Sequence, residues 1–455
     1  PDVTEALART PRARSPMPGR PGAAPRCPYH ARVHARPVTH LPTGSGVPGS
    51  VRVPTPFTRE DGNTMKRTFG AVIAGAMSLA LLSGCGGPAA TTSSAGGTAS
   101  SGPIKIGLNF EESGAVASYG TAEAQGAKMA ADEINAAGGI NGRQIQVVEY
   151  DDKSDPAQAT TLTTKLMTSD KVVTVIGPAT SGGMKATVPV ATKNQVPIIS
   201  GSATADDLTV TNGKVNDYVF RTCFNDSFQG TAMAKYAASK LNVKSAVILE
   251  DTSSDYAKGL AASFNSQLTS GGGKIVDTQA YKAGDTDFNA VLTKFKGQTF
   301  DAIYLPGYYQ EVGLVIAQAR KLGITAPILG GDGYDSPKLA ELAGAGLTDV
   351  YYTNHYSSAD KDPKVVAFID AYKKKFNAEP NAFNAMGYDT MMLVADAIKR
   401  AKDVTGPSIK DALASTKDFV AVTGTITIDP ATHNPIKSVT FIGYKDGKVA
   451  ATEKA

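Results

Sequence analysis

Residues 172–193 read VVTVIGPATSGGMKATVPVATK, and this stretch decides the fold. A β-branched run stops at Gly177, a small hydroxyl-rich turn follows, and an apolar-periodic segment comes next. This order predicts a buried strand, a Gly-rich turn and the start of a helix. Such a geometry presents backbone N–H groups to a negative group. The stretch is therefore a phosphate cradle, a site for another anion, or only a tight turn.

The same alternation of strand and helix signals runs along the chain from residue 104. The first series of predicted strands is 104–108, 144–150, 172–176, 196–200 and 218–221, with helices at 121–137, at 156–167 and after Ser181. The second series has strands 245–250, 274–280, 302–305 and 327–330 and helices 228–241, 256–269, 287–296 and 311–322. Helices 364–376 and 384–400 and strands 425–429 and 438–444 follow. The pattern predicts an α/β protein of two doubly wound parallel-sheet lobes, with ligand sites at the carboxyl ends of the strands.

The first 64 residues differ in composition from the rest of the chain. Nine arginines, no lysine and four acidic residues give them a net charge of +5, which leaves −1 for the remainder of the total of +4. Taken alone, such an Arg/Pro-rich head resembles a disordered basic arm that contacts nucleic acid. A second beginning inside the chain outweighs that interpretation, and we expect no nucleic-acid partner.

This second beginning has the layout of a secretory signal. Met65-Lys66-Arg67 is a cationic start, and the apolar stretch after it is too short to span a bilayer. Leu82-Ser83-Gly84-Cys85 then resembles the lipobox of bacterial lipoproteins, in which the cysteine is lipidated and becomes the first residue. We expect 1–64 to be a disordered, non-native upstream extension, 65–84 a lipoprotein signal peptide, and 85–103 the lipidated Cys85 with a flexible tether.

The motifs of the common enzyme classes are not found. Gly182 is not followed by the lysine of a Walker A loop, no G-x-G-x-x-G follows a strand, and Ser181 lacks the spacing of a nucleophile elbow. His355 and His433 lie far apart, and Cys223, between aromatic neighbours, is typical of a core residue. We expect no enzyme, no metal and no cofactor. An exported hydrolase that uses His355 is the alternative from another class.

Two hydroxyl-rich loops suggest a binding site instead. Ser181 ends the first loop, and the second, SGSATA at 200–205, follows the next strand. Neither loop contains lysine or arginine, and neutral donors suit a monovalent carboxylate better than a polyphosphate. Each hydroxyl taken singly could equally be a helix cap or turn former. Their concentration at the ends of two neighbouring strands favours the anion site, with a monovalent carboxylate as the anion.

Several longer segments carry a family resemblance. They are ESGAVASYG (112–120), VIGPATSGG (175–183), VPIISGSATADDLT (196–209), IYLPGYYQEVGLVIAQARKLG (303–323) and MGYDTMMLVADAI (386–398). Together they resemble the leucine/isoleucine/valine-binding proteins, the substrate-binding components of ABC importers with the type I periplasmic binding fold. The resemblance covers nearly all of the chain from residue 104 onward.

The resemblance implies two lobes, joined by three crossing segments, that close over an amino acid. Matched by position, Ser181 and Thr204 would donate to the ligand carboxylate, with Thr180 beside them in the first loop. The backbone carbonyl of Ser202 and the side chain of Asp332 would accept from the ligand ammonium. For Asp332, a turn-forming aspartate beside a glycine is the alternative.

Four tyrosines match aromatic positions of the family's site. Tyr119, Tyr308 and Tyr388 correspond to walls of the side-chain pocket, and Tyr256 to a tyrosine on the closing face. Each could instead be a core residue with a satisfied hydroxyl, and Tyr388, within a helix pattern, is the strongest case for that alternative.

The resemblance also implies a domain layout and a function. Lobe 1 would comprise 104–222 with 353–424, and lobe 2 would comprise 223–352 with 425–455. The protein would be a monomeric solute-binding lipoprotein, anchored through Cys85 to the outer face of the cytoplasmic membrane. It would bind an amino acid, in the first place a branched-chain one, and deliver it to the membrane subunits of an ABC permease.

Three departures from the family pattern leave the ligand open. Ser154 and Thr180 stand where well-known members have a disulfide, and Gly182 with its neighbour replaces a serine run. Asp332 is one methylene shorter than the usual glutamate. Another small carboxylate or an amide, such as an aromatic acid, is therefore the alternative ligand, and a receptor or sensor of the same fold is the alternative role.

Overall fold

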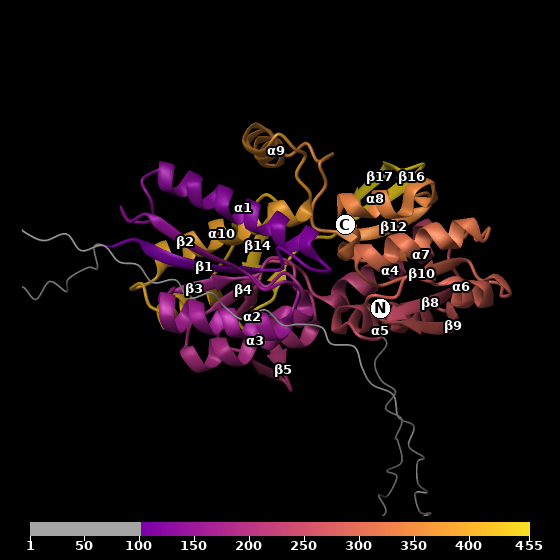
Figure 1. Cartoon of the computed structure of the whole chain (residues 1–455), viewed down its shortest axis with the longest axis horizontal. Coiled ribbons are helices and arrows are strands. Elements are labelled where there is room, and N and C mark those ends of the chain that lie inside the picture. Colours follow the sequence, from indigo (N-terminus) through magenta and orange to yellow (C-terminus); the bar gives the residue numbers. More distant parts are fainter. Residues whose placement is uncertain (1–101) are drawn as a thin grey trace, which may run out of the picture. The chain divides into compact units, whose positions relative to one another are not determined.

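The computed structural model describes residues 102–455 (Figure 1). The expected upstream extension, the signal peptide and Cys85 lie outside the described residues. Within 102–455 no helix is both long and apolar enough to cross a membrane.

The first sheet has five parallel strands in the order β2-β1-β3-β4-β7. These strands are β1 (Ile104–Phe110), β2 (Ile145–Asp151), β3 (Thr174–Ile176), β4 (Ile198–Ser200) and β7 (Val219–Arg221). The connecting helices are α1 (Ala117–Ala136), α2 (Pro156–Lys165) and α3 (Ser181–Asn194), and β5 (Val210–Thr211) pairs with β6 (Lys214–Val215) in a small hairpin. Helices cover both faces of such a sheet, which is why β1 is apolar and buried along nearly its whole length. We call this part, with the later segments that pack on it, lobe 1.

The second sheet has seven strands in the order β17-β16-β12-β11-β10-β8-β9. Its parallel strands are β8 (Ser245–Asp251), β9 (Lys274–Tyr281), β10 (Ala302–Tyr304), β11 (Ile328–Gly330) and β12 (Val350–Asn354). The helices of this lobe 2 are α4 (Asp226–Lys240), α5 (Asp255–Ser270), α6 (Asn289–Lys296), α7 (Tyr309–Lys321) and α8 (Pro337–Ala343). The prediction of two α/β lobes with doubly wound sheets is confirmed.

One edge of the second sheet departs from the predicted parallel arrangement. β16 (Thr440–Lys445) pairs antiparallel with β12, and β17 (Lys448–Lys454) pairs antiparallel with β16. The turn between them is Asp446-Gly447, and both residues have positive φ angles, of 50° and 76°. This is the geometry of a two-residue hairpin whose twist matches that of its strands. The hairpin therefore makes the second sheet mixed.

The chain returns to lobe 1 after β12. α9 (Pro363–Phe376), α10 (Ala382–Arg400) and α11 (Gly406–Ala414) follow, and α10 packs along α1 (Figure 1). The two helices approach closely because Gly126 and Gly387 face each other's backbones, where a Cβ atom would collide. This packing fixes the rotation of both helices, and therefore which side chains reach the space between the lobes.

The predicted boundary at 424/425 is wrong. The strands β13 (Phe419–Ala421), β14 (Gly424–Ile428) and β15 (Pro435–Ile436) form their own small antiparallel sheet, which packs on lobe 1. Asp389 of α10 accepts hydrogen bonds from the backbone at 422 and 423, at 2.7 and 2.8 Å, and His433 Nδ1 lies 3.1 Å from the carbonyl of Val219. Residues 425–429 are therefore not a strand of lobe 2. The three crossing segments are 222–225, 355–362 and 437–439.

Candidate functional site

A crevice between the two lobes collects almost all of the predicted site residues. It holds an empty space of about 240 Å³, part of which is open to solvent. Its walls are Tyr119, Ala179, Thr180, Ser181, Ser202, Thr204, Tyr256, Tyr308, Asp332, Gly333 and Phe383. The loops after β3, β4 and β11 contribute most of the polar groups, as expected for the carboxyl ends of parallel strands.

The two hydroxyl-rich loops meet at Ser181, the first residue of α3. Its Oγ accepts hydrogen bonds from the backbone N–H groups of Thr204 and Ala205, at 3.2 and 3.0 Å. The serine proton is thus free to be donated into the crevice. Thr204 is 1% exposed, and its Oγ1 has no hydrogen-bond partner within the described residues. A buried hydroxyl without a partner is costly, and a ligand acceptor would satisfy it.

The backbone groups ahead of α3 are already occupied. Glu111, at the end of β1, accepts hydrogen bonds from the N–H groups of Ala179 and Thr180, both at 2.9 Å, and from Thr180 Oγ1 at 2.6 Å. Thr180 also caps the helix by accepting from Gly183 N at 3.2 Å. A Cβ at Gly183 would lie 3.0 Å from Glu111 Oε1, so glycine leaves room for the carboxylate. The expected free N–H groups at 179 and 180 therefore serve an internal glutamate, and hydroxyls remain as donors to a ligand.

A second buried acid, Glu123 of α1, holds the loop after β4. The Ser202 hydroxyl donates to Glu123 Oε1 and also lies 2.8 Å from the carbonyl oxygen of Ala179. Burial raises the pKa of Glu123 to about 8, with the hydrogen bond from Ser202 acting in the opposite direction. Glu123 is thus mainly protonated at neutral pH. The Ser202 hydroxyl is turned away from the crevice, which leaves its backbone for ligand contact.

Asp332 provides the charge of the opposite wall. It lies in the 3₁₀ turn after β11 and is 3% exposed. Oδ1 accepts from Tyr256 Oη at 2.8 Å and from Gln229 Nε2 at 3.1 Å, and Oδ2 lies 2.9 Å from His355 Nε2. Burial lowers the pKa of His355, so its imidazole is neutral and donates through Nε2–H. All three partners of the carboxylate are therefore neutral donors, and its charge is left for a cation in the crevice.

Aromatic rings form the remaining walls. Tyr119 stacks on Phe383 with centroids 4.3 Å apart, and Tyr256 stacks on Tyr308 at 5.1 Å. The edge of Tyr308 meets Tyr119 at 5.6 Å, which joins the two stacks. The Tyr119 hydroxyl donates to the carbonyl of Gly333 at 2.5 Å. The tyrosine hydroxyls of Tyr119 and Tyr256 are thus engaged with protein groups, and the rings offer an apolar surface.

The prediction that Tyr388 lines the site is wrong. Its hydroxyl donates to Glu133 Oε2 at 2.6 Å, and its ring packs on Phe368 at 5.2 Å. Phe383 of the same helix takes the position in the crevice that was expected of Tyr388. Five residues of α-helix correspond to a rotation of about 140° around the axis, so the two side chains cannot share one face.

Several other functional neighbours were missed by sequence reasoning. Glu111 directly follows β1 and lies three residues beyond the predicted end of that strand at 108, and this position near a carboxyl end could have marked it. Glu123 lies four residues after Tyr119 on α1 and therefore on the same face. Gln229 and His355 carry no local signal, because only the packing of α4 and of the second crossing segment brings them to Asp332.

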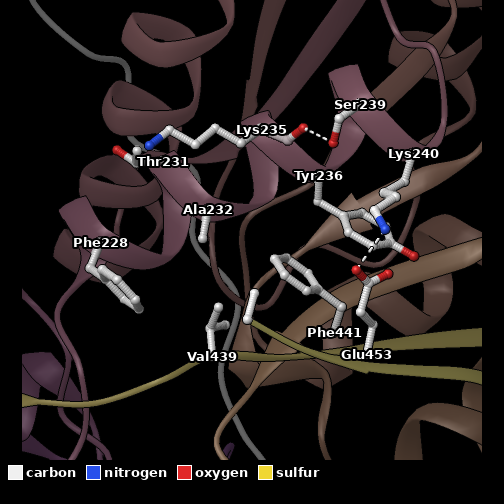
Figure 2. A pocket seen from close by; sticks show the side chains of 11 residues that line it. Phe228, Thr231, Ala232, Lys235, Tyr236, Ser239, Lys240, Val439, Phe441 and Glu453 are labelled. Atoms are coloured by element: carbon white, nitrogen blue, oxygen red, sulfur yellow. Dashed lines mark hydrogen bonds and ion pairs between the residues drawn. The ribbon is translucent and has the colours of Figure 1, made fainter.

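A second hollow lies on lobe 2 between α4 and the β16–β17 edge (Figure 2). Phe228, Tyr236 and Phe441 give it an apolar lining, and Lys240 pairs with Glu453 across its rim at 2.7 Å. None of the predicted site residues reaches it. Lys240 and Glu453 there are paired with each other, whereas the crevice holds a buried hydroxyl without a partner among the described residues and a buried carboxylate. The crevice is therefore the stronger candidate for a specific ligand site.

The fold and the crevice define a two-lobed solute-binding protein, and comparison with known proteins agrees. The sequence profile of the periplasmic binding protein family matches residues 103–448, and the chain belongs to this family. Within residues 102–455 no cluster of three or more His, Cys, Asp or Glu side chains could hold a metal ion.

Three relatives illustrate the similarity. The leucine-, isoleucine-, valine-, threonine- and alanine-binding protein of Pseudomonas aeruginosa is 31% identical over 342 residues, which is 75% of this chain and 89% of the relative. The branched-chain amino acid transporter substrate-binding protein LivJ of Streptococcus pneumoniae, solved with isoleucine, is 49% identical with a TM-score of 0.74, and the match covers 78% of this chain and 99% of LivJ. An ABC-transporter solute-binding protein of R. palustris, solved with benzoate, is 27% identical with a TM-score of 0.68, covering 77% and 95%.

Proposed function

We propose that this protein is the extracytoplasmic binding component of an ABC importer, and that it captures an amino acid, first of all a branched-chain one, between its lobes. The proposal depends on one observation: the two ends of the crevice carry complementary polar groups, hydrogen-bond donors at one end and a carboxylate at the other. One end holds Ser181 and Thr204, whose hydroxyls can donate to a carboxylate. The other end holds Asp332, a buried carboxylate with neutral partners only. A small zwitterion satisfies both ends at once.

The energetics favour a ligand with both charges. Each hydrogen bond to the ligand carboxylate contributes on the order of 1.5–3 kcal/mol. The ammonium gives Asp332 the positive partner that a buried carboxylate needs, and removing one partner of a buried pair costs about 3–5 kcal/mol. The aromatic walls fit an apolar side chain. The complex of LivJ with isoleucine supports a branched-chain ligand.

Binding and release require the lobes to move about the crossing segments. The lobes touch around the crevice: Ser118 Oγ and Ser336 Oγ are 2.8 Å apart, and Lys185 Nζ of α3 lies 2.9 Å from Asp255 Oδ2 of α5. Because these contacts join the lobes beside the crevice, we propose that a ligand enters when the lobes part. We propose that the closed, loaded protein acts as a monomer and is recognised by the membrane subunits of the permease.

An aromatic acid is the second candidate ligand. The R. palustris protein solved with benzoate supports it, as do the rings that line the crevice. A simple carboxylate would, however, leave Asp332 buried without a positive partner. An exported hydrolase has less support, since His355 is 3% exposed and does not line the crevice.

The test is calorimetric titration of the purified protein with the amino acids, after unfolding and refolding to remove any bound ligand. We expect saturable 1:1 binding of at least one of leucine, isoleucine and valine. Binding of benzoate-type acids with silence across all amino acids would overturn the amino-acid assignment and leave the fold.

The lipid anchor is a separate proposal that depends on Leu82-Ser83-Gly84-Cys85. Expression from Met65 in a bacterial host, followed by intact-mass analysis, should give a chain that begins at Cys85 and carries a diacylglyceryl group. A Cys85→Ser variant should be released from the membrane fraction. A wild-type chain with an unmodified Cys85 would contradict the anchor.

A further inference from the structure

His355 is a buried side chain that the proposed function does not yet use. It directly follows β12 and opens the second crossing segment. Its ring stacks on Phe224 of the first crossing segment, with centroids 3.7 Å apart and planes 22° apart. Its backbone N–H donates to its neighbour's side chain, Asn354 Oδ1, at 2.8 Å. Stacking on Phe224 therefore orients the imidazole, and the hydrogen bond to Asn354 restrains the backbone from which it projects.

In this orientation the ring directs Nε2 toward Asp332 of the crevice. Nε2 lies 2.9 Å from Asp332 Oδ2, and both side chains are at most 4% exposed. Nδ1 has no hydrogen-bond partner within the described residues. The ring is neutral because burial lowers its pKa, against the attraction of Asp332 and with the repulsion of Lys437. A neutral ring that donates through Nε2 must carry its proton there, which leaves Nδ1 as a lone pair.

The three hydrogen-bond donors to Asp332 are distributed unevenly between its two carboxylate oxygens. Tyr256 and Gln229 both donate to Oδ1, whereas His355 is the single protein donor to Oδ2. Oδ2 keeps one free acceptor position, and the hydrogen bond from His355 adds a third anchor, the one that acts directly on this oxygen. A neutral donor can do this without neutralising the charge, which a lysine or arginine would do.

We propose that His355 is the positioning residue of the ammonium site: its Nε2–H holds Asp332 Oδ2 in the orientation that receives the ligand's ammonium group. The inference rests on the proposed function, because it assigns a role within the same site. It concerns the side chain through which the second crossing segment contacts the site.

The chain offers a matched control in His433, the other histidine of residues 102–455. This side chain is also buried and stacks on a phenylalanine, Phe220, with centroids 4.1 Å apart. It contacts the protein through the opposite nitrogen, Nδ1, which lies 3.1 Å from the carbonyl of Val219, and it lies outside the crevice. A side-chain amide of glutamine reaches the position of Nε2, whereas that of asparagine reaches the position of Nδ1.

The experiment compares four variants by isoleucine titration and thermal unfolding. We expect His355→Asn to weaken isoleucine binding about tenfold or more, the usual effect of losing a hydrogen bond to a charged group. His355→Gln should stay within about threefold of the wild type, because its amide still reaches Asp332. For His433, both substitutions should leave affinity unchanged, and asparagine should preserve the melting temperature better than glutamine.

Provided that the wild-type protein binds isoleucine, either of two results would overturn the inference. One is wild-type affinity in His355→Asn, and the other is an equal loss of affinity in the asparagine and glutamine variants. If the variants do not fold, nitrogen NMR of the wild-type histidines decides: the inference requires a neutral, Nε2-protonated His355 whose signals move in Asp332→Asn. An Nδ1-protonated ring would contradict it. Failure of the proposed function would look different from failure of this inference, because the wild-type protein itself would then bind no amino acid.

Discussion

The two ends of the crevice differ in charge: one end is lined by neutral hydroxyl groups and the other by a carboxylate. On lobe 1, the hydroxyl residues Ser181 and Thr204 line the crevice, and none of the lining residues that the structure describes at that end is charged. On lobe 2, the side chain of Asp332 lies on the crevice wall. A ligand carboxylate needs only donors, whereas an ammonium gains most from a real counter-charge in a site of low dielectric. The crevice is therefore polar at both ends and charged at one.

The acids of the two lobes extend this comparison. Glu111 and Glu123 of lobe 1 lie behind the hydroxyl loops, where they hold backbone and side-chain donors in place. Asp332 lies in front, on the crevice wall. The same functional group thus serves as scaffold on one lobe and as ligand contact on the other. What separates the two positions is that the glutamates lie behind the loops, whereas Asp332 lies on the wall of the crevice.

The largest expected effect comes from removing the charge of lobe 2. Asp332→Asn should weaken isoleucine binding by at least about 100-fold, because the ammonium loses its buried counter-charge. The variant keeps the shape of the side chain, but its NH2 group would face the Nε2–H of His355, so the melting temperature without ligand should fall moderately. Titration calorimetry measures the loss, and Asp396→Asn, which removes an exposed pair with Arg400, is the control. Equal losses in the two variants would show that Asp332 has no special role.

Removing a donor from lobe 1 should cost less. Thr204→Val replaces the unpartnered hydroxyl by a methyl group of similar size, and affinity should fall about tenfold because one hydrogen bond to the ligand carboxylate is lost. The unliganded variant should be as stable as the wild type or more stable, since a buried polar group without a partner disappears. Thr192→Val on the exposed side of α3 is the control. Unchanged affinity would make Thr204 a turn residue only.

Titration of Glu123, which lies behind the hydroxyl loops, should make the free energy of unfolding depend on pH. Its pKa is about 8 in the folded protein against an ordinary value of 4.5, so between these pH values the folded state holds a proton that the unfolded chain has lost. The free energy of unfolding should therefore fall as the pH rises through this window. Asp152, with its pKa also raised to about 8 by burial, contributes in the same direction.

Glu123→Gln cannot titrate and should flatten this dependence in part. Urea unfolding at pH 5, 7 and 8.5 measures it, with the exposed Glu341→Gln as the control. A slope identical to that of the wild type would mean that Glu123 is ionised in the folded protein, and the assignment of a protonated scaffold would fail.

The smallest effect concerns the contact across the mouth of the crevice. Lys185→Met removes the ion pairs with Asp207 of lobe 1 and Asp255 of lobe 2, at 2.5 and 2.9 Å. All three side chains are more than a third exposed, so the pair with Asp255 should contribute less than about 1 kcal/mol. Ligand dissociation, followed by stopped flow, should accelerate about two- to threefold at low salt and not at high salt. A large effect that persists at high salt would mean that Lys185 contacts the ligand instead.

Local signals in the sequence predicted much of lobe 1 correctly. The strand, turn and helix of residues 172–193 exist as β3, the loop and α3. The two hydroxyl loops do converge, because neighbouring parallel strands end at one edge of the sheet. The roles of single residues came from the family resemblance, since spacing alone does not distinguish a ligand contact from a helix cap.

The wrong predictions have a common physical cause, which is packing between distant segments. Phe383 rather than Tyr388 enters the crevice because the contact of α10 with α1 fixes the rotation of the helix. The strand at 424–428 remains on lobe 1 because Asp389 binds the backbone beside it. Glu111 accepts hydrogen bonds from the N–H groups that were expected to bind an anion. The first two contacts have no local sequence signal, and for Glu111 the only signal is its position after the first strand.

The central claim is that the crevice recognises both charges of a zwitterion, and one measurement tests it directly. The wild-type protein is titrated with isoleucine and with its two single-charge analogues, the acid without the amino group and the amine without the carboxyl group. The account predicts that isoleucine binds at least about 100-fold more tightly than either analogue, because each analogue leaves one end of the crevice unsatisfied. Equal affinity for isoleucine and the deaminated acid would contradict it and would make this protein a receptor for simple carboxylates.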